Sequence, residues 1–248
     1  MKYIDKDYTT SDVQTHNNEL NARSLDENSL LDRTNYPGQT GRDLWHKIRD
    51  IKEIPHFWNL KHQMMKEQGG ICCYCGLKIA FDGDSQFSKA TVEHLIPKGL
   101  QRELVGEYKN LLLSCSLTQQ DRNDVTMGIC TTSDVTHCGD AKQNKKLNYT
   151  PLQSDCHIRF VYDIWGNVKE TDSKSKTDID TLNLNCTALV DRRKNAMEIL
   201  FDDHGNFISD SELKIISNNI IARQSDGNFR EFCFVIKSVV DDLLNSKP

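Results

Sequence analysis

The residues best suited to chemistry lie in the middle of the chain. Cys72 and Cys75 are separated by two residues and followed by Gly76, and this spacing lets both thiolates reach one metal ion. Structural zinc takes four soft ligands in a tetrahedron, commonly as two close pairs that the fold brings together. The pattern therefore predicts a zinc knuckle here, with a second pair of ligands supplied from further along the chain.

The second pair of zinc ligands has four candidates, which are Cys115, Cys130, His137 and Cys138. We favour Cys115 with Cys138 and expect Cys73 to point away from the ion. The alternative is a set of unpaired buried thiols. The same knuckle could also serve thiol redox chemistry, but that use needs a βαβ context with a cysteine at a helix start. The sequence predicts neither.

A second chemical centre is the adjacent pair Glu93 and His94. A neutral imidazole can take a proton from water, because its pKa lies near working pH. A carboxylate can bind a hard cation such as Mg²⁺ or Mn²⁺ through oxygen. Neighbouring side chains on a strand point to opposite sides, so the two groups are expected to face different surroundings. The alternative is a structural histidine whose hydrogen bonds are satisfied within the fold.

The order of these residues resembles the HNH endonucleases, whose ββα-metal motif is often braced by a zinc ribbon. It runs from the Cys72–Cys75 knuckle through Glu93, His94 and Pro97 to Asn110 and Cys115, within about residues 70–146. The resemblance implies hydrolysis of phosphodiester bonds with His94 as the general base and Glu93 as a ligand of catalytic Mg²⁺ or Mn²⁺. It implies that Asn110 hydrogen-bonds to backbone and holds the loop around His94, since a loosely held base loses rate.

The chain departs from the HNH pattern after its last zinc cysteine. The family usually places a second metal ligand on the helix there, where this chain has Gly139. Asp140 is the nearest replacement, and Asn144 is the next, one turn further along the expected helix; His137 could also reach. If none of them serves, the domain is expected to be a weak or inactive nuclease. A zinc-braced binding module without catalysis is therefore the second class of function.

A narrower resemblance spans about residues 70–200. The run from Thr136 to Lys142, the segments 160–162 and 166–167, and the run from Leu182 to Arg193 look like the HNH proteins of bacterial anti-phage systems, the Septu PtuB-like proteins, also found beside retron reverse transcriptases. This resemblance implies a PtuA-like ATPase partner, and in the retron case a reverse transcriptase with its DNA and RNA. The alternative for Leu182 to Arg193 is an ordinary helix packed on the core.

Binding of nucleic acid is less directly encoded. The net charge is −5, which counts against unaided contact with phosphates, although residues 142–146 could form a local basic patch. Lys98 and Lys142 are the candidates for phosphate contact, and solvated surface lysines are the alternative. DNA is the default substrate of the resembled family, and RNA, including tRNA, stays open.

These motifs need elements to position them. Apolar periodicity predicts helices over residues 41–51 and from Pro55 to Gly69. A β-hairpin is expected from residues 79–81 and 90–92 around a turn at 82–85, its second strand ending at the Glu93–His94 pair. Residues 1–40 are expected to form a loosely held arm with a turn at 34–38. Residues 109–115 form a short apolar run, 116–137 are expected to be a loop, and a short helix should start at Cys138.

The last hundred residues are expected to be mainly helical. A hairpin is predicted over residues 158–168 and a polar linker over 169–180. Thr187 is expected to cap a helix that runs to about Phe201. Ser209 and Glu212 fit a capping box, and a final amphipathic helix is predicted over residues 229–243. The predicted class is α+β, with an N-terminal arm and helices at 1–69, an HNH core with its zinc site at 70–150, and a hairpin with helices at 151–248.

Composition bounds these interpretations. The chain has 248 residues, 37% of them apolar and 27% charged, which is typical of a soluble globular protein. No apolar run is long enough to span a bilayer, and the polar, acidic start predicts no signal peptide. A cytoplasmic protein without a membrane partner is expected.

Overall fold

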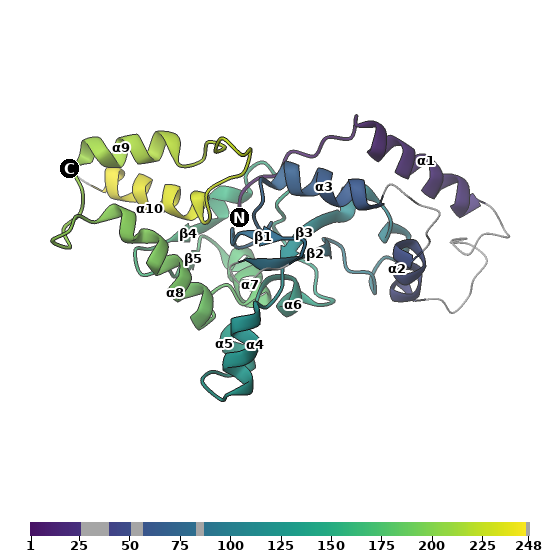
Figure 1. Cartoon of the computed structure of the whole chain (residues 1–248), viewed down its shortest axis with the longest axis horizontal. Coiled ribbons are helices and arrows are strands. Elements are labelled where there is room, and N and C mark those ends of the chain that lie inside the picture. The colour runs from purple at the N-terminus through teal and green to yellow at the C-terminus, as the bar shows by residue number, and fades with distance from the viewer. Residues whose placement is uncertain (26–39, 51–56, 83–86, 247–248) are drawn as a thin grey trace.

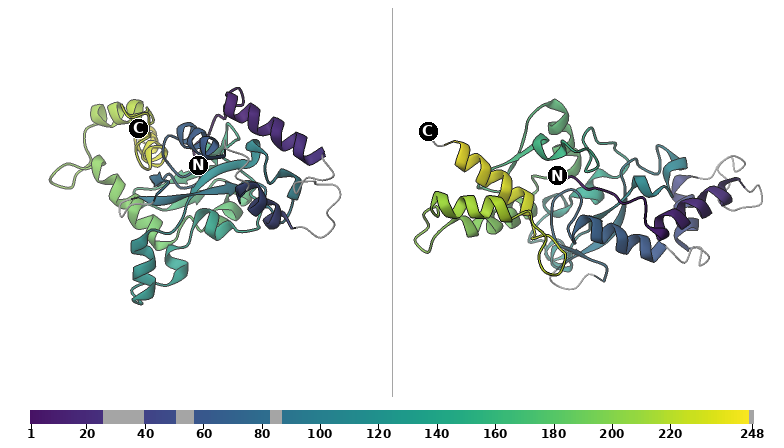
Figure 2. Two further views of the ribbon diagram at one scale, coloured as in Figure 1. Left: turned by 45° about the vertical axis from the view of Figure 1, so that its right-hand side comes forward. Right: turned by 90° about the horizontal axis from the view of Figure 1, so that it is seen from above.

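Two small β-sheets lie at the centre of the described chain, and helices surround them (Figure 1). The structure is a computed structural model that describes residues 1–25, 40–50, 57–82 and 87–246. Helices α1 (Ser11–Leu25), α2 (Gly41–Asp50) and α3 (Phe57–Gln68) gather on one side of the sheets (Figure 1). Helices α8 (Thr187–Ala196), α9 (Asp210–Asn219) and α10 (Cys233–Asn245) gather on the opposite side (Figures 1 and 2). The predicted α+β class is confirmed.

The larger sheet has the order β1 (Ile79–Ala80), β2 (Ser88–His94), β3 (Leu111–Cys115). Strand β2 pairs antiparallel with β3, so His94 lies opposite Leu111. Every residue of β3 is buried, and its backbone groups must therefore find partners inside the protein. The predicted hairpin is wrong, because β1 runs parallel to β2 and β3 supplies the antiparallel neighbour. Most of the predicted turn, from residue 83 onward, lies outside the described residues.

The N-terminal segment is packed against the sheet rather than loosely held. Met1 and Ile4 are buried, and Nζ of Lys6 donates to the backbone oxygen of Leu111 over 3.0 Å. Few residues of this segment are apolar, but Met1 and Ile4 are part of the hydrophobic core. Helix α1 (Ser11–Leu25) then follows. The predicted turn at 34–38 and the helix start at Pro55 lie outside the described residues.

Helices α2 (Gly41–Asp50) and α3 (Phe57–Gln68) agree with the predicted periodicity. Gly69 and Gly70 directly follow helix α3, and their φ angles of 60° and 71° are both positive. A glycine after the last helical turn tolerates that conformation without strain from a side chain. This ending delivers the chain directly into the cysteine knuckle.

A helical spur replaces the loop that was predicted for residues 116–137. It holds α4 (Gln119–Thr126) and α5 (Thr132–Val135) and projects from the body of the protein (Figure 1). Capping boxes open both helices, with Thr118 and Asp121 in α4 and a matching pair in α5. Arg192 lies 2.6 Å from Asp121, so an ion pair anchors the spur to α8. These capping boxes stabilise the two helices, although their sequences lack the apolar periodicity of a typical amphipathic helix.

The predicted hairpin near Gly166 is confirmed. Strands β4 (Phe160–Tyr162) and β5 (Val168–Glu170) pair antiparallel. The predicted polar linker after it is wrong, since α7 (Ser173–Leu182) opens there with a capping box at Asp172 and Ser175. Asp178 of this helix is buried and accepts hydrogen bonds from the backbone of Asn148 and Tyr149. A buried carboxylate with such partners holds α7 in place.

The C-terminal region packs helix on helix. Helix α8 (Thr187–Ala196) begins one residue after its cap, which is Cys186 rather than the predicted Thr187. Helix α9 (Asp210–Asn219) begins at the predicted Ser209 capping box, and α10 (Cys233–Asn245) follows. In the described part of the chain, short 3₁₀ helices span Arg102–Leu104, Tyr108–Asn110, Cys156–Arg159 and Met197–Leu200. Among the described residues, none of the helices has the length and apolar character that crossing a membrane requires.

Candidate metal centre and active-site cleft

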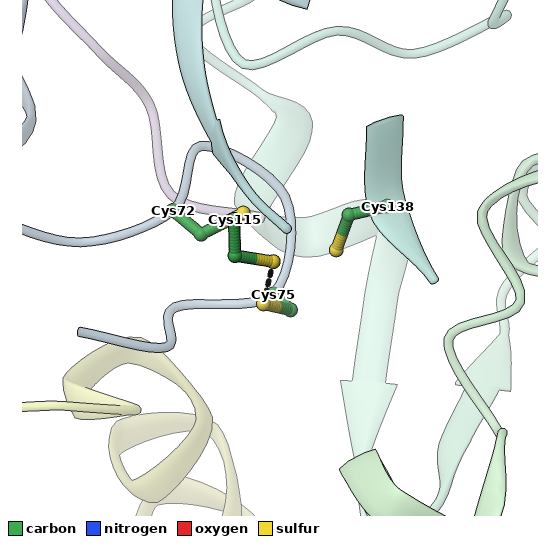
Figure 3. Close-up of side chains that lie close together, drawn as sticks. All are labelled: Cys72, Cys75, Cys115 and Cys138. Atoms are coloured by element: carbon green, nitrogen blue, oxygen red, sulfur yellow. Dashed lines mark hydrogen bonds between the residues drawn. The ribbon is translucent and has the colours of Figure 1, made fainter. Parts of the chain in front are cut away.

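Four buried cysteines come together at the end of β3 (Figure 3). They are the four that we favoured from the sequence: Cys72, Cys75, Cys115 and Cys138. All four Sγ atoms lie within 4.8 Å of one another, and those of Cys75 and Cys115 are 3.7 Å apart. Sulfur ligands of one tetrahedral zinc ion are about 3.8 Å apart, given Zn–S bonds of about 2.3 Å. The group could therefore hold a zinc ion.

The knuckle is shaped by its own backbone. The amide of Tyr74 donates to Sγ of Cys72, and that of Leu77 donates to Sγ of Cys75, each over 3.5 Å. Gly76 has a φ of 85°, and a Cβ there would lie 2.6 Å from the ring of Phe234. Both the turn and the packing of α10 therefore require glycine. Amide donors of this kind stabilise sulfur in its thiolate form.

The electrostatics of the four sulfurs favour a cation. Burial raises the pKa of the Cys72 thiol, but hydrogen bonds from Cys115 and Cys138 outweigh it and hold that pKa well below its usual value. Burial holds the pKa of Cys138 well above its usual value, and its sulfur neighbours act in the same direction. One thiolate thus suppresses ionisation of the next. A divalent ion removes this conflict and deprotonates its thiol ligands.

The other candidates for the zinc site lie outside this group. Nδ1 of His137 is 3.3 Å from Sγ of Cys138 and 3.5 Å from Sγ of Cys115, so its ring packs beside the sulfurs. Burial lowers the pKa of His137 to about 4, which keeps the ring neutral. Cys130 is half-exposed on the spur, and Cys73 is buried next to the knuckle. Neither belongs to the group of four.

A cleft opens beside the metal centre. Residues from α2, from the end of β2 and from α6 (Cys138–Lys142) line it, and its volume is about 680 Å³. Its lining includes the predicted catalytic pair and most of the groups around it: Trp45, Glu93, His94, Lys98, Gly139 and Asn144. A hollow of this size accommodates a small part of a polymer or a small ligand.

The imidazole of His94 is held by a hydrogen bond and by a ring contact. Its Nε2 lies 2.9 Å from the backbone oxygen of Val105. Because a carbonyl oxygen only accepts, Nε2 carries the hydrogen and Nδ1 keeps its lone pair. The ring of Trp45 meets the imidazole edge to face, with centroids 4.6 Å apart. Burial, followed by the charge of Lys98, lowers the pKa of His94 to about 3. The imidazole is therefore neutral, and at this pKa it is a weak base.

Glu93 faces different surroundings from His94. Its Oε1 accepts hydrogen bonds from Nζ of Lys142 over 2.7 Å and from the hydroxyl of Tyr74 over 3.1 Å. Burial raises the pKa of Glu93, although the ammonium of Lys142 opposes this. A Cβ built on Gly139 would lie 2.7 Å from Oε2 and 3.1 Å from Oγ of Ser114. Glycine at this position therefore makes room for the carboxylate.

Asn110 joins two segments of backbone around His94. Its Oδ1 accepts from the amide of Ile96 over 2.8 Å, and its Nδ2 donates to the backbone oxygens of Ile96 and Leu104 over 3.1 Å each. Asn110 is itself buried. These contacts hold the chain on both sides of the turn that follows His94. They are the kind of bonds that the HNH resemblance implies for this residue.

The two candidates for a second cation ligand separate in space. Asp140 is exposed, lies outside the cleft lining, and accepts a hydrogen bond from the backbone of Leu117 beside Arg122. Asn144 lines the cleft, and its side chain lies against Gly99. The expected position of Asn144 on the helix is wrong, because α6 ends at Lys142. Of the two, only Asn144 shares the cleft with Glu93.

The two lysines predicted to contact phosphate, Lys98 and Lys142, lie in different surroundings. Lys98 lines the cleft, with Nζ 5.7 Å from the centre of the Trp45 ring. For Lys142 the alternative to phosphate contact, a solvated surface lysine, is wrong. Its side chain is 1% exposed, and its ammonium bonds to Glu93 and to the backbone oxygen of His94. The carboxylate draws it inward and satisfies its charge.

No family model matches the chain. The chain is similar to the Septu protein PtuB of Bacillus thuringiensis, with 29% identity over 148 residues. The match covers 59% of this chain and 45% of that protein, so the chain spans less than half the length of this curated relative. The similarity supports a Septu-like family, in agreement with the narrower of the two resemblances seen in the sequence.

Three residues of the site were missed by the sequence argument. Tyr74 lies inside the knuckle and reaches Glu93, Val105 supplies only a carbonyl, and Trp45 comes from α2. A carbonyl has no sequence signature, and Trp45 looked like an ordinary member of an apolar helix face. The position of Tyr74 between two predicted zinc ligands was the one available signal.

Proposed function

We propose that this chain is a zinc-stabilised, metal-dependent nuclease of the HNH type that hydrolyses phosphodiester bonds of nucleic acid. One observation carries the proposal. A neutral imidazole, oriented by the backbone oxygen of Val105, lines the same cleft as the carboxylate of Glu93. DNA is the favoured substrate class, and RNA, including tRNA, is the second.

In this mechanism His94 accepts the proton of the attacking water at Nδ1. A phosphate in the cleft brings negative charge close to the imidazole, which raises its pKa from about 3 toward the working range. Asn110 keeps the loop around His94 in place, and Lys98, at the cleft wall, is positioned to attract phosphate. The zinc centre braces β3 and α6 and takes no part in the chemistry.

Glu93 and Asn144 are the groups that would hold a catalytic Mg²⁺ or Mn²⁺. Both offer oxygen ligands and both line the cleft, and such an ion is commonly bound by one or two protein groups, with substrate phosphate and water completing its shell. The bound ion would neutralise charge that develops on the phosphate and the leaving oxygen. Asp140 is left out of this site by its position.

The biological setting is proposed from the relative's name and the sequence resemblance. We place the chain as the toxic effector of a bacterial anti-phage complex in the cytoplasm. A PtuA-like ATPase would hold it in check, and a retron reverse transcriptase with its DNA and RNA is a further candidate partner. A partner that delivers nucleic acid would also offset the net charge of −5.

A zinc-braced binding module without catalysis is the second candidate function. Two observations favour it: Gly139 offers no ligand, and Lys142 already occupies one oxygen of Glu93. Such a module would keep its zinc and its fold, and it would bind nucleic acid or protein without cleaving it.

One experiment separates the two functions. The purified protein, alone and together with the products of its neighbouring genes, is incubated with labelled DNA and RNA in Mg²⁺ or in EDTA. The nuclease proposal expects cleavage in Mg²⁺ that EDTA abolishes. Cleavage that ignores EDTA would contradict the mechanism, and binding without cleavage in every arm would favour the module.

A further inference from the structure

Lys142 brings a positive charge into contact with both proposed catalytic residues. Its Nζ lies 2.7 Å from Oε1 of Glu93 and 2.8 Å from the backbone oxygen of His94, and its side chain is 1% exposed. Removing an ammonium from water is costly unless an ion pair and further hydrogen bonds compensate for the lost hydration. The contact is therefore a fixed, buried part of the fold next to the cleft, unlike an exposed surface ion pair.

The two oxygens of Glu93 are not equivalent as a result. Oε1 receives two donors, the ammonium of Lys142 and the hydroxyl of Tyr74. Oε2 faces Gly139, where even one added carbon would lie 2.7 Å away. Oε1 is occupied by donors, so Oε2 is the oxygen that can meet a cation. Any ion bound there has a lysine charge as its close neighbour.

We propose that Lys142 is a positioning residue that fixes Glu93 through Oε1 and whose charge keeps the affinity for the divalent ion low until a substrate phosphate enters the cleft. The inference rests on the proposed function, because it takes Glu93 as the ligand of the catalytic ion. The ammonium of Lys142 repels a nearby divalent cation, whereas a phosphate next to both attracts them and makes the net electrostatic energy favourable. The ion and the nucleic acid therefore bind together, and the free protein carries little Mg²⁺ or Mn²⁺.

The test is Mn²⁺ binding by the zinc-loaded full chain without nucleic acid, followed by the electron paramagnetic resonance signal of free Mn²⁺. Lys142→Met keeps the length of the side chain and removes its charge, so the Kd for Mn²⁺ should fall about tenfold. Tyr74→Phe is the matched control, because it removes the other hydrogen bond to the same oxygen without changing charge. Its Kd should stay within about twofold of wild type.

A second readout distinguishes positioning from a purely structural role. At saturating Mn²⁺, Lys142→Met should cleave nucleic acid more slowly than wild type, since Glu93 has lost the group that orients it. Tighter ion binding together with slower cleavage is not expected from a lysine that only stabilises the fold. If Lys142→Met does not fold, Lys142→Gln carries the same test, because its amide is a neutral donor.

Glu93→Gln separates failure of this inference from failure of the proposed function. If Glu93→Gln abolishes Mn²⁺ binding while both Lys142 variants bind Mn²⁺ no more tightly than wild type, the role of Lys142 is overturned and the nuclease proposal stands. If Glu93→Gln binds Mn²⁺ as tightly as wild type, the metal site itself is wrong and both proposals fall. Tighter binding in both Lys142 variants, lost on adding Glu93→Gln, is the expected result.

Discussion

Nε2 of His94 lies 2.9 Å from the backbone oxygen of Val105, and this contact decides which nitrogen of the ring can act as a base. The hydrogen on Nε2 is committed to the carbonyl, so the lone pair of Nδ1 is the proton acceptor. A catalytic histidine whose second nitrogen is held in this way keeps one tautomer and one orientation. Val105 thus acts through its backbone, which no substitution of its side chain removes.

Replacement of His94 by alanine should reduce the cleavage rate by a factor of about 10² to 10⁴, the usual contribution of a general base. The measurement is cleavage of labelled DNA and RNA at saturating Mg²⁺, with circular dichroism to show that the fold is kept. His62→Ala is the matched control, because His62, on α3, packs beside Trp58 and Phe81 and does not line the cleft. Unchanged cleavage by His94→Ala would exclude His94 as the base.

The stability of the fold should depend on pH through His94. The pKa of this histidine is about 3 in the folded chain, against an ordinary value of 6.5, chiefly because of burial. Between these values the unfolded chain binds a proton that the folded chain does not, so the free energy of unfolding falls as the pH drops below about 6.5. His94→Gln removes this contribution.

Urea denaturation at several pH values between about pH 7 and pH 4 tests whether the free energy of unfolding falls toward acid as expected. The stability of wild type relative to His94→Gln should decline steadily toward acid, by a slope that approaches one proton. His137 also has a lowered pKa, but it is present in both proteins and cancels in the difference. A constant difference, or one that grows toward acid, contradicts the burial of a neutral His94.

Asn110 offers a test of the brace. Asn110→Asp keeps the size of the side chain and loses the two Nδ2 bonds to the backbone oxygens of Ile96 and Leu104. It also turns a carboxylate toward those oxygens, so the loss of stability should be about 1–3 kcal/mol, measured by urea denaturation. Cleavage should slow as well, because the loop that orients His94 loosens. If Asn110→Asp loses stability but cleaves at the wild-type rate, Asn110 has no role in the mechanism.

Some of this architecture could be read from the sequence, because its signals are local. The knuckle at Cys72 and Cys75 and the capping box at Ser209 and Glu212 each depend on a few residues within one turn of chain. The contacts of Asn110 with Ile96 and Leu104 also agree with what the HNH resemblance implies. Patterns of this kind can be recognised without the tertiary structure, because the residues that form them are close together in the sequence.

Other features could not be read because they depend on partners far away in sequence. The burial of Lys142 follows from a carboxylate 49 residues away, and without that contact a lysine in a basic run looks solvated. The arm before α1 looked too polar to pack, yet Lys6 bonds to the backbone of Leu111. The spur helices were missed for another reason, since the boxes at Thr118 and Thr131 were local signals that a search for apolar period overlooks.

The group of four cysteines, as a candidate zinc site, leads us to expect different effects from substituting different cysteines. Serine at Cys72 or Cys138 should lower the zinc content from about one ion per chain and destabilise the fold, since a tetrahedral site needs all four ligands. Cys73→Ser is the matched control, because Cys73 is buried beside Cys72 but lies outside the group of four. Elemental analysis of purified variants measures the metal. Zinc retained by Cys72→Ser, or lost by Cys73→Ser, would contradict the assignment.

We expect that position 139 cannot accept the second metal ligand that the HNH pattern places there. A side chain there begins with a Cβ only 2.7 Å from Oε2 of Glu93 and 3.1 Å from Oγ of Ser114. Gly139→Ala should therefore cost about 1–3 kcal/mol of stability through overpacking and slow cleavage by displacing Glu93. Gly139→Asn should do the same or worse, although asparagine carries the oxygen that the HNH pattern expects at this point.

Gly99→Ala is the control for this prediction, because its new methyl group would meet Asn144 at an ordinary contact distance of 3.4 Å. Its midpoint in urea should stay close to that of wild type, while that of Gly139→Ala falls. If Gly139→Asn instead gains activity and binds Mn²⁺ more tightly, Glu93 has room to move. The expectation that position 139 cannot accept a second metal ligand would then be wrong.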